Sequence, residues 1–517
     1  MNIPAIDWAI VMPTIVVICV GILGLLIEMV RPKQNNNLIV GVTLAGLGFA
    51  FYLLLGQLNR PTASTMGGLV YRDQFSVLLQ LVMVGATGMC MLFSEAYLRQ
   101  KRIAYGEFYP MALWSLSGGM IMVGTQSLLM LFVGLEVLSI ALYCLAGMAR
   151  AEQRSEESAL KYFLLGAFAS AFLLYGIAFI FGASGTIDLQ ALGQMYEGEP
   201  YSGLLTLLGI TMLIIGFGFK AGVVPFHQWT PDVYQGAPTN VTAFMSAVSK
   251  IAAVGALTRV LFAAIPHIDI WMPAMTVVAI VTMTLGNLVA LVQRDVKRAL
   301  AYSSIAHAGY LLVGVLAHVS DPEKVSLSSV VFYLVAYSLM TIGAFAVVSL
   351  TAKAGKEGTR TSDLRGLWKR APFAAMALLI CLVSLVGVPP TAGFFGKFAI
   401  FTDALAAGLT TLAIALAVNS AISAFYYWQI IKAAFIDEEP ATGANFAPEG
   451  AGIKLTSVIA IVGVVFIGFF SGPVLEVSKR AGTDIIEEQK AAQALEEAER
   501  AKIGEVPGAE LAPGFGG

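Results

Sequence analysis

Residues 214–232 read IIGFGFKAGVVPFHQWTPD, and residues 385–401 read LVGVPPTAGFFGKFAIF. Each stretch places a lysine, Lys220 or Lys397, among glycines and prolines inside an otherwise apolar segment. Proline removes a backbone donor and glycine relaxes φ, so both segments are predicted to be helices that break near their middle. At membrane depth, unwound backbone and a charged side chain are tolerated where they are buried in protein or line a polar cavity. The two stretches therefore predict a membrane protein with two broken helices around a polar interior.

The composition is that of a polytopic membrane protein. Of its 517 residues, 57% are hydrophobic and 12% charged, with a mean hydropathy of +0.79, whereas a soluble domain carries about 25% charged residues. The net charge of −2 gives no indication of nucleic-acid binding. The four cysteines lie far apart in apolar segments without CxxC spacing, so we expect neither disulfides nor a metal site. No basic region precedes the first apolar segment, so we expect a retained helix, not a signal peptide.

A helix that spans a bilayer needs about 20 mostly apolar residues. Such windows fall at 8–30, 38–56, 74–95, 109–123, 125–148, 158–182, 203–224, 239–263, 270–291, 299–318, 328–351, 372–401, 408–433 and 453–474. The sequence therefore predicts an all-α polytopic membrane protein with about 14 transmembrane helices.

The two broken segments occupy corresponding places in two sets of five helices, residues 109–263 and residues 270–434. In each set the fourth helix is the broken one, and the second helix carries an ionisable residue, Glu136 or His307. Because five is an odd number, a second copy must enter the membrane from the opposite face. We therefore predict two inverted five-helix repeats, a pattern that points to a site at the membrane midplane.

The remaining segments flank these repeats. Residues 1–95 are predicted to form three N-terminal transmembrane helices, residues 453–474 the last one, and residues 475–517 a polar, acidic tail. One set of alternate loops carries eighteen lysines and arginines, and the other set four. Since cytoplasmic loops are rich in basic residues, we expect both termini outside, in the inner (plasma) membrane of a bacterium.

Ionisable side chains within the predicted spans indicate a path for protons. A charge at mid-membrane depth costs about 3 kcal/mol on insertion scales, so such residues usually serve an ion path. Burial disfavours the charged form of an amine, a nearby carboxylate favours it, and histidine relays protons through either ring nitrogen. Lys161 follows a polar stretch, and its amine could also reach the membrane surface. The predicted proton-path residues are Glu136, Lys161, Lys220, Lys250, Lys397 and His307. Hydroxyls that could order bridging water belong to Ser246, Ser249, Ser303, Ser304 and Tyr310.

No motif for redox or nucleotide chemistry is present in the sequence. There is no GxGxxG after a strand, no Walker pattern, no cysteine cluster and no histidine pair at haem spacing. We therefore expect no cofactor and no metal on this chain, and transport driven by a partner protein or by an ion gradient.

Five stretches resemble the antiporter-like membrane subunits of respiratory complex I, which share a fold with multisubunit sodium/proton antiporters. The stretches are LFVGLEVLSIALYCLAG (131–147), EESALKYFLLGAFASAFLLYG (156–176), GFGFKAGVVPFHQWTPDVYQGAPTNVTAFMSAVSK (216–250), KRALAYSSIAHAGY (297–310) and GVPPTAGFFGKF (387–398). The resemblance runs over roughly residues 75–435. It is greatest to the N subunit, called subunit 2 in mitochondria and chloroplasts, because of the LEVLSIALY motif and a lysine at position 397.

The resemblance implies a role for each matching residue. Glu136 matches a glutamate that pairs with the lysine of the broken seventh helix, here Lys220. Lys161, Lys250 and Lys397 match lysines of helices six, eight and twelve. It further implies two half-channels joined by a polar axis, driven by quinone reduction in other subunits with electrons from NADH or another donor. The implied partners are M- and L-type antiporter-like subunits and small membrane subunits.

Two other classes of protein stay open at this point. An Mrp-type sodium/proton antiporter subunit would share the fold, and more carboxylates at the binding station would favour it. A membrane anchor without an ion path is disfavoured by the buried lysines.

Overall fold

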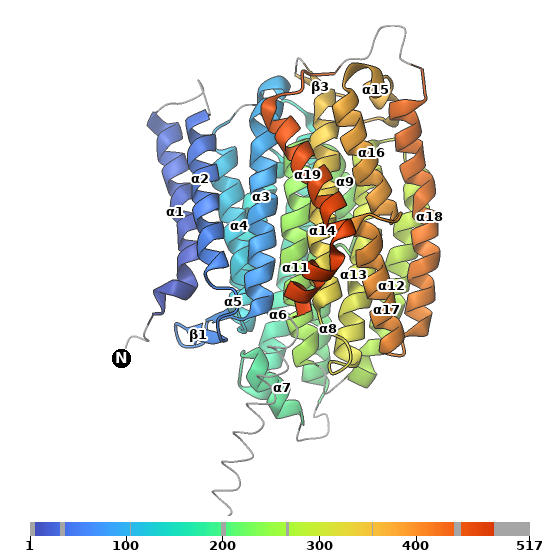
Figure 1. The fold of residues 1–517 in the computed structure, drawn as a ribbon. Helices are drawn as coiled ribbons and strands as arrows, with labels where there is room; N and C mark the ends of the chain where they lie inside the picture. Colours follow the sequence, from blue (N-terminus) through green and yellow to red (C-terminus); the bar gives the residue numbers. More distant parts are fainter. Residues whose placement is uncertain are drawn as a thin grey trace, which may run out of the picture.

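The computed structural model describes residues 6–30, 37–103, 105–197, 203–264, 268–353, 355–438 and 446–479. Most of its helices run side by side along one axis, with short connections at the two ends (Figure 1). The first half of the chain contains α1 (Trp8–Val30), α2 (Asn37–Leu55), β1 (Ala63–Thr65), β2 (Val70–Arg72), α3 (Gln74–Lys101), α4 (Phe108–Val123), α5 (Leu128–Ala146), α6 (Gln153–Ser184), α7 (Leu189–Glu197), α8 (Leu204–Ala221), α9 (Trp229–Gly236), α10 (Thr239–Phe244), η1 (Met245–Ser249) and α11 (Lys250–Ala263).

The second half begins with two long helices and ends with a helix that crosses the face of the bundle in Figure 1. Its elements are α12 (Ile268–Ala290), α13 (Val296–Ser320), α14 (Ser328–Val348), η3 (Ser349–Thr351), β3 (Ala352–Lys353), β4 (Lys356–Glu357), η4 (Thr361–Leu364), α15 (Leu367–Arg370), α16 (Pro372–Val386), α17 (Ala392–Ala406), α18 (Thr410–Phe435) and α19 (Ala451–Phe469).

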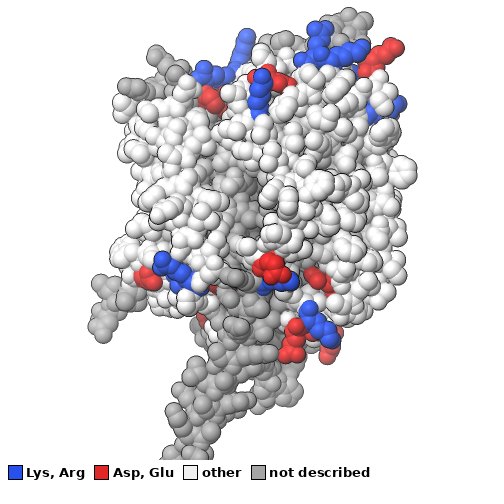
Figure 2. Space-filling view, viewed as in Figure 1, with Lys and Arg blue, Asp and Glu red and all other residues white. Residues whose placement is uncertain are grey.

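The prediction of an all-α polytopic membrane protein is confirmed. Within the described ranges, twelve helices are long and apolar enough to cross a membrane, and α4 and α16 are shorter apolar helices. Charged side chains gather at the two ends of the bundle, and a wide band without them lies between (Figure 2). The predicted count of fourteen spans and the inverted repeat stay predictions.

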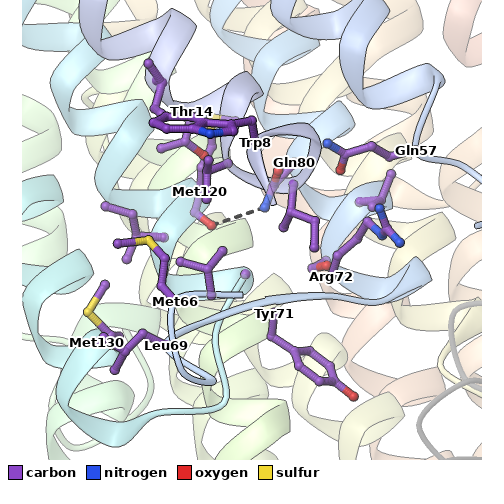
Figure 3. Close-up of a pocket in the computed structure, with 18 of the residues that line it drawn as sticks. Trp8, Thr14, Gln57, Met66, Leu69, Tyr71, Arg72, Gln80, Met120 and Met130 are labelled. Atoms are coloured by element: carbon purple, nitrogen blue, oxygen red, sulfur yellow. Dashed lines mark hydrogen bonds between the residues drawn. The ribbon is translucent and has the colours of Figure 1, made fainter. Parts of the chain in front are cut away.

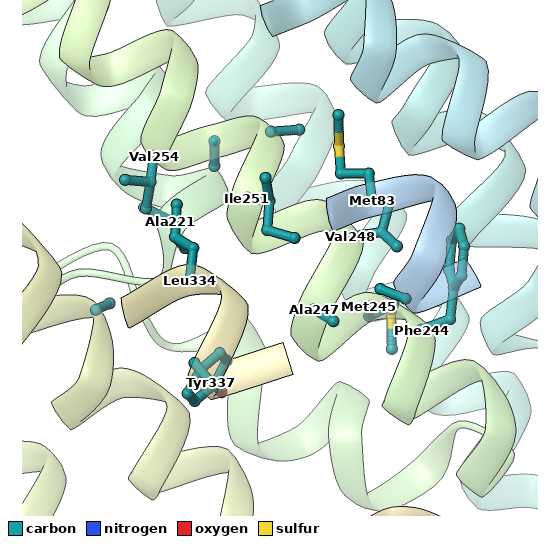
Figure 4. Packing of buried hydrophobic residues seen from close by; sticks show 14 of the residues in the cluster. Met83, Ala221, Phe244, Met245, Ala247, Val248, Ile251, Val254, Leu334 and Tyr337 are labelled. Atoms are coloured by element: carbon teal, nitrogen blue, oxygen red, sulfur yellow. The ribbon is translucent and has the colours of Figure 1, made fainter. Parts of the chain in front are cut away.

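Three helical segments form the buried centre of the bundle. The apolar windows of the α10–η1–α11 unit, of α13 and of the helix from Ser328 to Thr351 are 100%, 94% and 89% buried, whereas those of α1, α6 and α18 are each 33% buried. Methionine, valine and isoleucine side chains fill the space where η1 and α11 meet α14 and α3 (Figure 4). Because Lys250 and His307 belong to this central group, neither side chain can reach lipid or bulk water.

Both predicted breaks are present. α8 ends before Gly222 (φ 76°) and the chain becomes helical again in α9 at Trp229. α16 ends before Gly387 (φ 92°), and α17 begins at Ala392. A positive φ strains a residue with a Cβ atom, so glycine at these two positions ends each half-helix. The last carbonyls of α8 and α16 are thereby left without partners in their own helices.

Several local features were not predicted. The short helix α9 lies beyond the window 203–224, because its mixed sequence WTPDVYQG has no apolar run. The window 239–263 contains a π-helix, Met245–Ser249, which no sequence pattern indicated. The hairpins β1–β2 and β3–β4 were also missed. The acidic tail falls mostly outside the described residues, which end at residue 479 in a helical segment.

Candidate functional site

Lys220 lies in the last turn of α8, just before the break, and is 3% exposed. Its amine donates to Ser139 Oγ of α5 at 2.7 Å and to the Tyr162 hydroxyl of α6 at 3.0 Å. The ring of Trp229, at the start of α9, stacks on Tyr162 with centroids 4.6 Å apart. The two halves of the broken helix are thus joined around one amine, whose acceptors are both neutral.

Glu136 is half-buried on α5 and accepts a hydrogen bond from Ser170 Oγ of α6. The resemblance implied that this carboxylate pairs with Lys220. No ion pair within 4.0 Å joins the two side chains in the described structure; Ser139, three residues beyond Glu136, contacts the amine instead. The field of the carboxylate still reaches the amine. The two charges therefore act on each other without direct contact.

Lys250 follows the π-helix directly and is 5% exposed. Its amine donates to the carbonyl oxygen of Ser304 on α13 at 2.6 Å, and to the Ala221 carbonyl at 3.5 Å. It also lies 5.7 Å from the centroid of the Tyr337 ring. Ala221 is the last residue of α8, so the lysine amine lies at the negative end of a half-helix.

Lys397 repeats this arrangement at the second break. It lies in the second turn of α17, and its amine donates to the carbonyls of Leu385 and Val386, at 2.9 and 3.0 Å. These residues end α16, the first half of the broken helix. Ser420 Oγ of α18 accepts at 3.0 Å, and the Tyr310 ring lies 4.8 Å away. Carbonyls at unwound half-helix ends are the groups that coordinate cations in transporters of this kind.

His307 lies on α13 between these two lysines and is fully buried. Its Nδ1 is 2.6 Å from the hydroxyl of Tyr333, and its Nε2 is 3.2 Å from the hydroxyl of Tyr427. Ser304 contacts Lys250 and Tyr310 contacts Lys397, so three residues at spacings of three form a polar row along one face of α13. The row joins the two lysine sites.

Lys161 lies elsewhere. Its side chain is 42% exposed, in line with the interpretation that its amine reaches the surface, and it forms ion pairs with Glu157 (2.6 Å) and Asp232 of α9 (2.9 Å). Asp232 also binds Arg298 at 2.6 Å. Lys161, Glu157 and Asp232 line a polar cavity of about 160 Å³. Helix α6 begins at Gln153, five residues before the predicted window 158–182, so the polar stretch before Lys161 is part of the helix.

Some of the hydroxyl-bearing residues predicted to order water contact the polar row, and others bond within their own helix. The Ser303 hydroxyl is bonded to that of Tyr427, and the Ser304 carbonyl binds Lys250, whereas Ser246 bonds back to its own helix at the Ala243 carbonyl. The contact residues that the sequence reasoning missed are Ser139, Tyr162, Ser170, Asp232, Tyr333, Tyr337, Ser420 and Tyr427. A search for polar residues one helical turn from each ionisable residue would have found Ser139, which lies three positions after Glu136.

The described residues contain no group of three or more histidine, cysteine, aspartate or glutamate side chains that could hold a metal ion. The polar atoms of the central row belong to lysine, histidine, tyrosine and serine together with backbone carbonyls. Such a set can bind and pass protons, since each member except the carbonyls carries an exchangeable hydrogen.

Comparisons with known proteins place these features in one family. The family model described as "NADH:quinone oxidoreductase/Mrp antiporter, TM" matches residues 125–423. NADH-quinone oxidoreductase subunit N 1 of Sorangium cellulosum is 42% identical over 466 residues, which cover 87% of this chain and 91% of the relative. A chain of respiratory complex I from Thermus thermophilus has a TM-score of 0.78 at 34% identity, covering 90% of this chain and 99% of that one. A chain of the Mrp complex from Dietzia sp. has a TM-score of 0.80 at 22% identity, and the match covers 94% of this chain and 99% of that one. At this identity the likeness shows a shared fold alone.

Proposed function

Because the chain belongs to the subunit N family of the NADH-quinone oxidoreductases, we propose that it translocates protons as a membrane subunit of such a complex. The redox reaction that drives translocation takes place in other subunits. In this proposal NADH, or another donor, and quinone bind to those subunits, and this chain holds no cofactor. Its partners are M- and L-type antiporter-like subunits and small membrane subunits, together with the lipid bilayer.

One observation carries the proposal: the polar row on α13 joins the amines of two broken-helix sites through the protein interior. Lys250 contacts Ser304, His307 follows one turn later, and the Tyr310 ring faces Lys397. A buried charge without a functional reason is costly. Two amines held at half-helix ends and linked by a histidine fit a chain of proton-binding groups.

The ends of the path follow from the distribution of charge. We assign proton uptake to the cavity of Lys161 and Asp232, which gives water access to one end of the bundle. From there protons pass to Lys220, which responds to Glu136, and on through Lys250 and His307. Lys397 releases them on the other side. The excess of basic residues in one set of loops supports an orientation with both termini outside and uptake from the cytoplasm.

This assignment groups the helices into functional units. In it, residues 109–263 form the half-channel that contains Lys220, and residues 270–434 form the half-channel of Lys397. Residues 1–95 and 453–474 are transmembrane segments outside the repeats, and residues 475–517 form a polar tail. The similar geometry of the two breaks supports this division, because each places a lysine amine at the carbonyl end of a half-helix.

An Mrp-type sodium/proton antiporter subunit is the alternative. The shared fold fits it equally well, but the names of the relatives at 36–42% identity favour the oxidoreductase. The three central lysine amines also have only neutral hydrogen-bond partners in the described structure, whereas hard cations such as Na⁺ favour oxygen-rich sites with carboxylates.

The test replaces Lys220 in the assembled complex, reconstituted in vesicles, and measures protons moved per electron transferred to quinone. Lys220→Ala should reduce this ratio strongly. Lys220→Arg should also reduce it, because a guanidinium stays charged and cannot cycle between protonation states. Lys324→Ala is the matched control, since Lys324 is 69% exposed and pairs with nearby Asp321. A wild-type ratio in an assembled Arg variant would show that Lys220 carries no proton. Transport driven by a sodium gradient without quinone reduction would favour the alternative.

A further inference from the structure

A second cavity lies at the end of the bundle where α1 begins, remote from the polar row of α13. It has a volume of about 370 Å³ and is enclosed by α1, the β1–β2 hairpin, α3, α4 and the start of α5. Figure 3 shows Met66, Leu69 and Met130 on one side and Arg72 with Gln57 on the other. Its volume falls in the range of about 300–1,000 Å³ that is typical of small-molecule sites.

The lining is apolar along most of its length. Val11 of α1, Val77 of α3 and Met120 of α4 lie along it, and methionine is adaptable enough to pack against a flexible chain. Trp8 also lines it and is 57% exposed at the start of α1. Tryptophan is enriched at the level of lipid head groups, so the cavity runs inward from that level.

One charged group faces this apolar space. Arg72, the last residue of β2, is 8% exposed; its Nη2 donates to the Pro61 carbonyl at 2.8 Å, and its Nε has no partner. Within the described residues the guanidinium forms no ion pair within 4.0 Å. Burial lowers the pKa of Arg72, the field of the exposed Asp7 raises it and that of Arg60 lowers it. Two arginines and one carboxylate leave this corner with a net positive charge.

An anion would satisfy the free donor of this buried cation, and a hydrocarbon chain would fill the apolar cavity beside it. We infer that this cavity binds an anionic phospholipid, with the phosphate on Arg72 and an acyl chain between α1 and α4. A planar fork of N–H donors suits a phosphate, which stays charged at every physiological pH. A quinone would fill the apolar space but would bring no charge to Arg72. The site is independent of the proposed proton path.

The test uses the assembled complex in nanodiscs of phosphatidylcholine that contain a trace of photoreactive lipid. One probe is phosphatidylglycerol with a diazirine in its acyl chain, and the other is phosphatidylcholine with the same chain. Labelled residues are identified by mass spectrometry. The anionic probe should label cavity residues such as Met130 about tenfold more than the neutral probe, because the choline cation of phosphatidylcholine offsets much of the attraction between its phosphate and Arg72. Excess inorganic phosphate should not displace it.

Two variants separate the parts of the site. Arg72→Gln should lower labelling by phosphatidylglycerol to the level of the neutral probe, whereas Arg60→Gln, a control at an exposed arginine, should keep most of it. Val11→Trp leaves the arginine in place and fills the cavity, so it should abolish labelling by both probes even if Arg72→Gln does not assemble. Equal labelling by the two probes in the wild type, or unchanged labelling in Val11→Trp, overturns the proposal. Displacement by a soluble phosphate, or by a quinone in preference to phosphatidylglycerol, overturns it as well.

Discussion

His307 offers the sharpest test of proton passage along α13. Its two ring nitrogens contact two tyrosine hydroxyls, Tyr333 at Nδ1 and Tyr427 at Nε2. The hydroxyl of Tyr427 has a second partner in Ser303, whereas no other hydrogen bond is found for the Tyr333 hydroxyl within the described structure. A substitution at position 307 therefore affects the two tyrosines unequally.

The structure gives the cost of each substitution. His307→Leu leaves the Tyr333 hydroxyl buried without a partner, which costs about 1–3 kcal/mol, or roughly five- to 150-fold in the folding equilibrium. His307→Asn places an amide near the position of Nδ1 and can keep the bond to Tyr333. The Asn variant should therefore assemble nearly as well as the wild type, but an amide cannot take up and release a proton as imidazole does.

The assay compares assembly, quinone reduction and protons per electron for the three forms of the reconstituted complex. If His307 relays protons, the Leu and Asn variants should both lose coupled proton transport in this chain, although only the Leu variant should assemble poorly. If His307 serves packing alone, the Asn variant should pump as the wild type does. That second outcome would refute the relay and leave Lys250 and Lys397 in separate paths.

Three further predictions concern other positions. Glu136→Gln should lower pumping. Combined with Lys220→Ala, it should show non-additive losses of pumping rate, since the two charges act on each other. A strictly additive double-mutant cycle for pumping rates would show that the two residues act independently. Lys397→Ala should block proton release and yet allow protonation of Lys220 from the inside, which infrared difference spectra of the reduced complex can detect. A wild-type ratio of protons per electron would contradict the assignment of proton release to Lys397. Glu357, whose side chain is 4% exposed, is the third site. Burial alone would raise its pKa, but Lys297 and Lys101 lower the pKa from 4.5 to about 2. This carboxylate thus stabilises the fold above about pH 4.5, and the gain, on the order of 3 kcal/mol, is lost as the pH falls towards 2. Glu357→Gln should flatten this dependence in thermal unfolding; an unchanged pH profile would exclude the ion cluster as its cause.

The fold could be predicted because its determinants are local. Apolar windows of about twenty residues identify spanning helices, and the Gly–Pro clusters beside Lys220 and Lys397 identify the two breaks. The π-helix before Lys250 could not be predicted, because no residue pattern in Met245–Ser249 indicates it. The helix α9 was missed for a related reason: its residues are helical through contacts with α6 and α13, and they form no apolar run.

The sequence indicated the ionisable residues of the site, but it did not indicate most of their contact partners. Each ionisable residue within a span is visible in the sequence, but its partners come from other helices, and one sequence does not reveal which helices pack together. The pairing of Glu136 with Lys220 illustrates this, because Ser139 on the next turn contacts the amine instead. Lys161 illustrates a second limit: Asp232, its partner, lies 71 positions away on a helix that was not predicted.

The distribution of charge partners explains why the interior suits proton transfer. Ion pairs hold Lys161 to Asp232, Lys101 to Glu357 and Arg259 to Asp73. Breaking a buried pair such as Lys101–Glu357 or Arg259–Asp73 costs about 3–5 kcal/mol, so the members of these two pairs keep their charges, whereas the Lys161–Asp232 pair is partly exposed. The amines in the middle of the membrane instead have hydroxyls and backbone carbonyls as acceptors.

Neutral acceptors change the behaviour of a buried amine. A hydrogen bond from a charged amine to a carbonyl contributes about 1.5–3 kcal/mol, less than a buried ion pair, and removing the charge of the amine leaves no second charge unpaired in the low-dielectric interior. The chain therefore combines fixed ion pairs with central amines, Lys220, Lys250 and Lys397, that can change charge without disrupting the fold. A carboxylate placed in direct contact with any of these three amines would fix its charge, and it should arrest transport while leaving the helices in place.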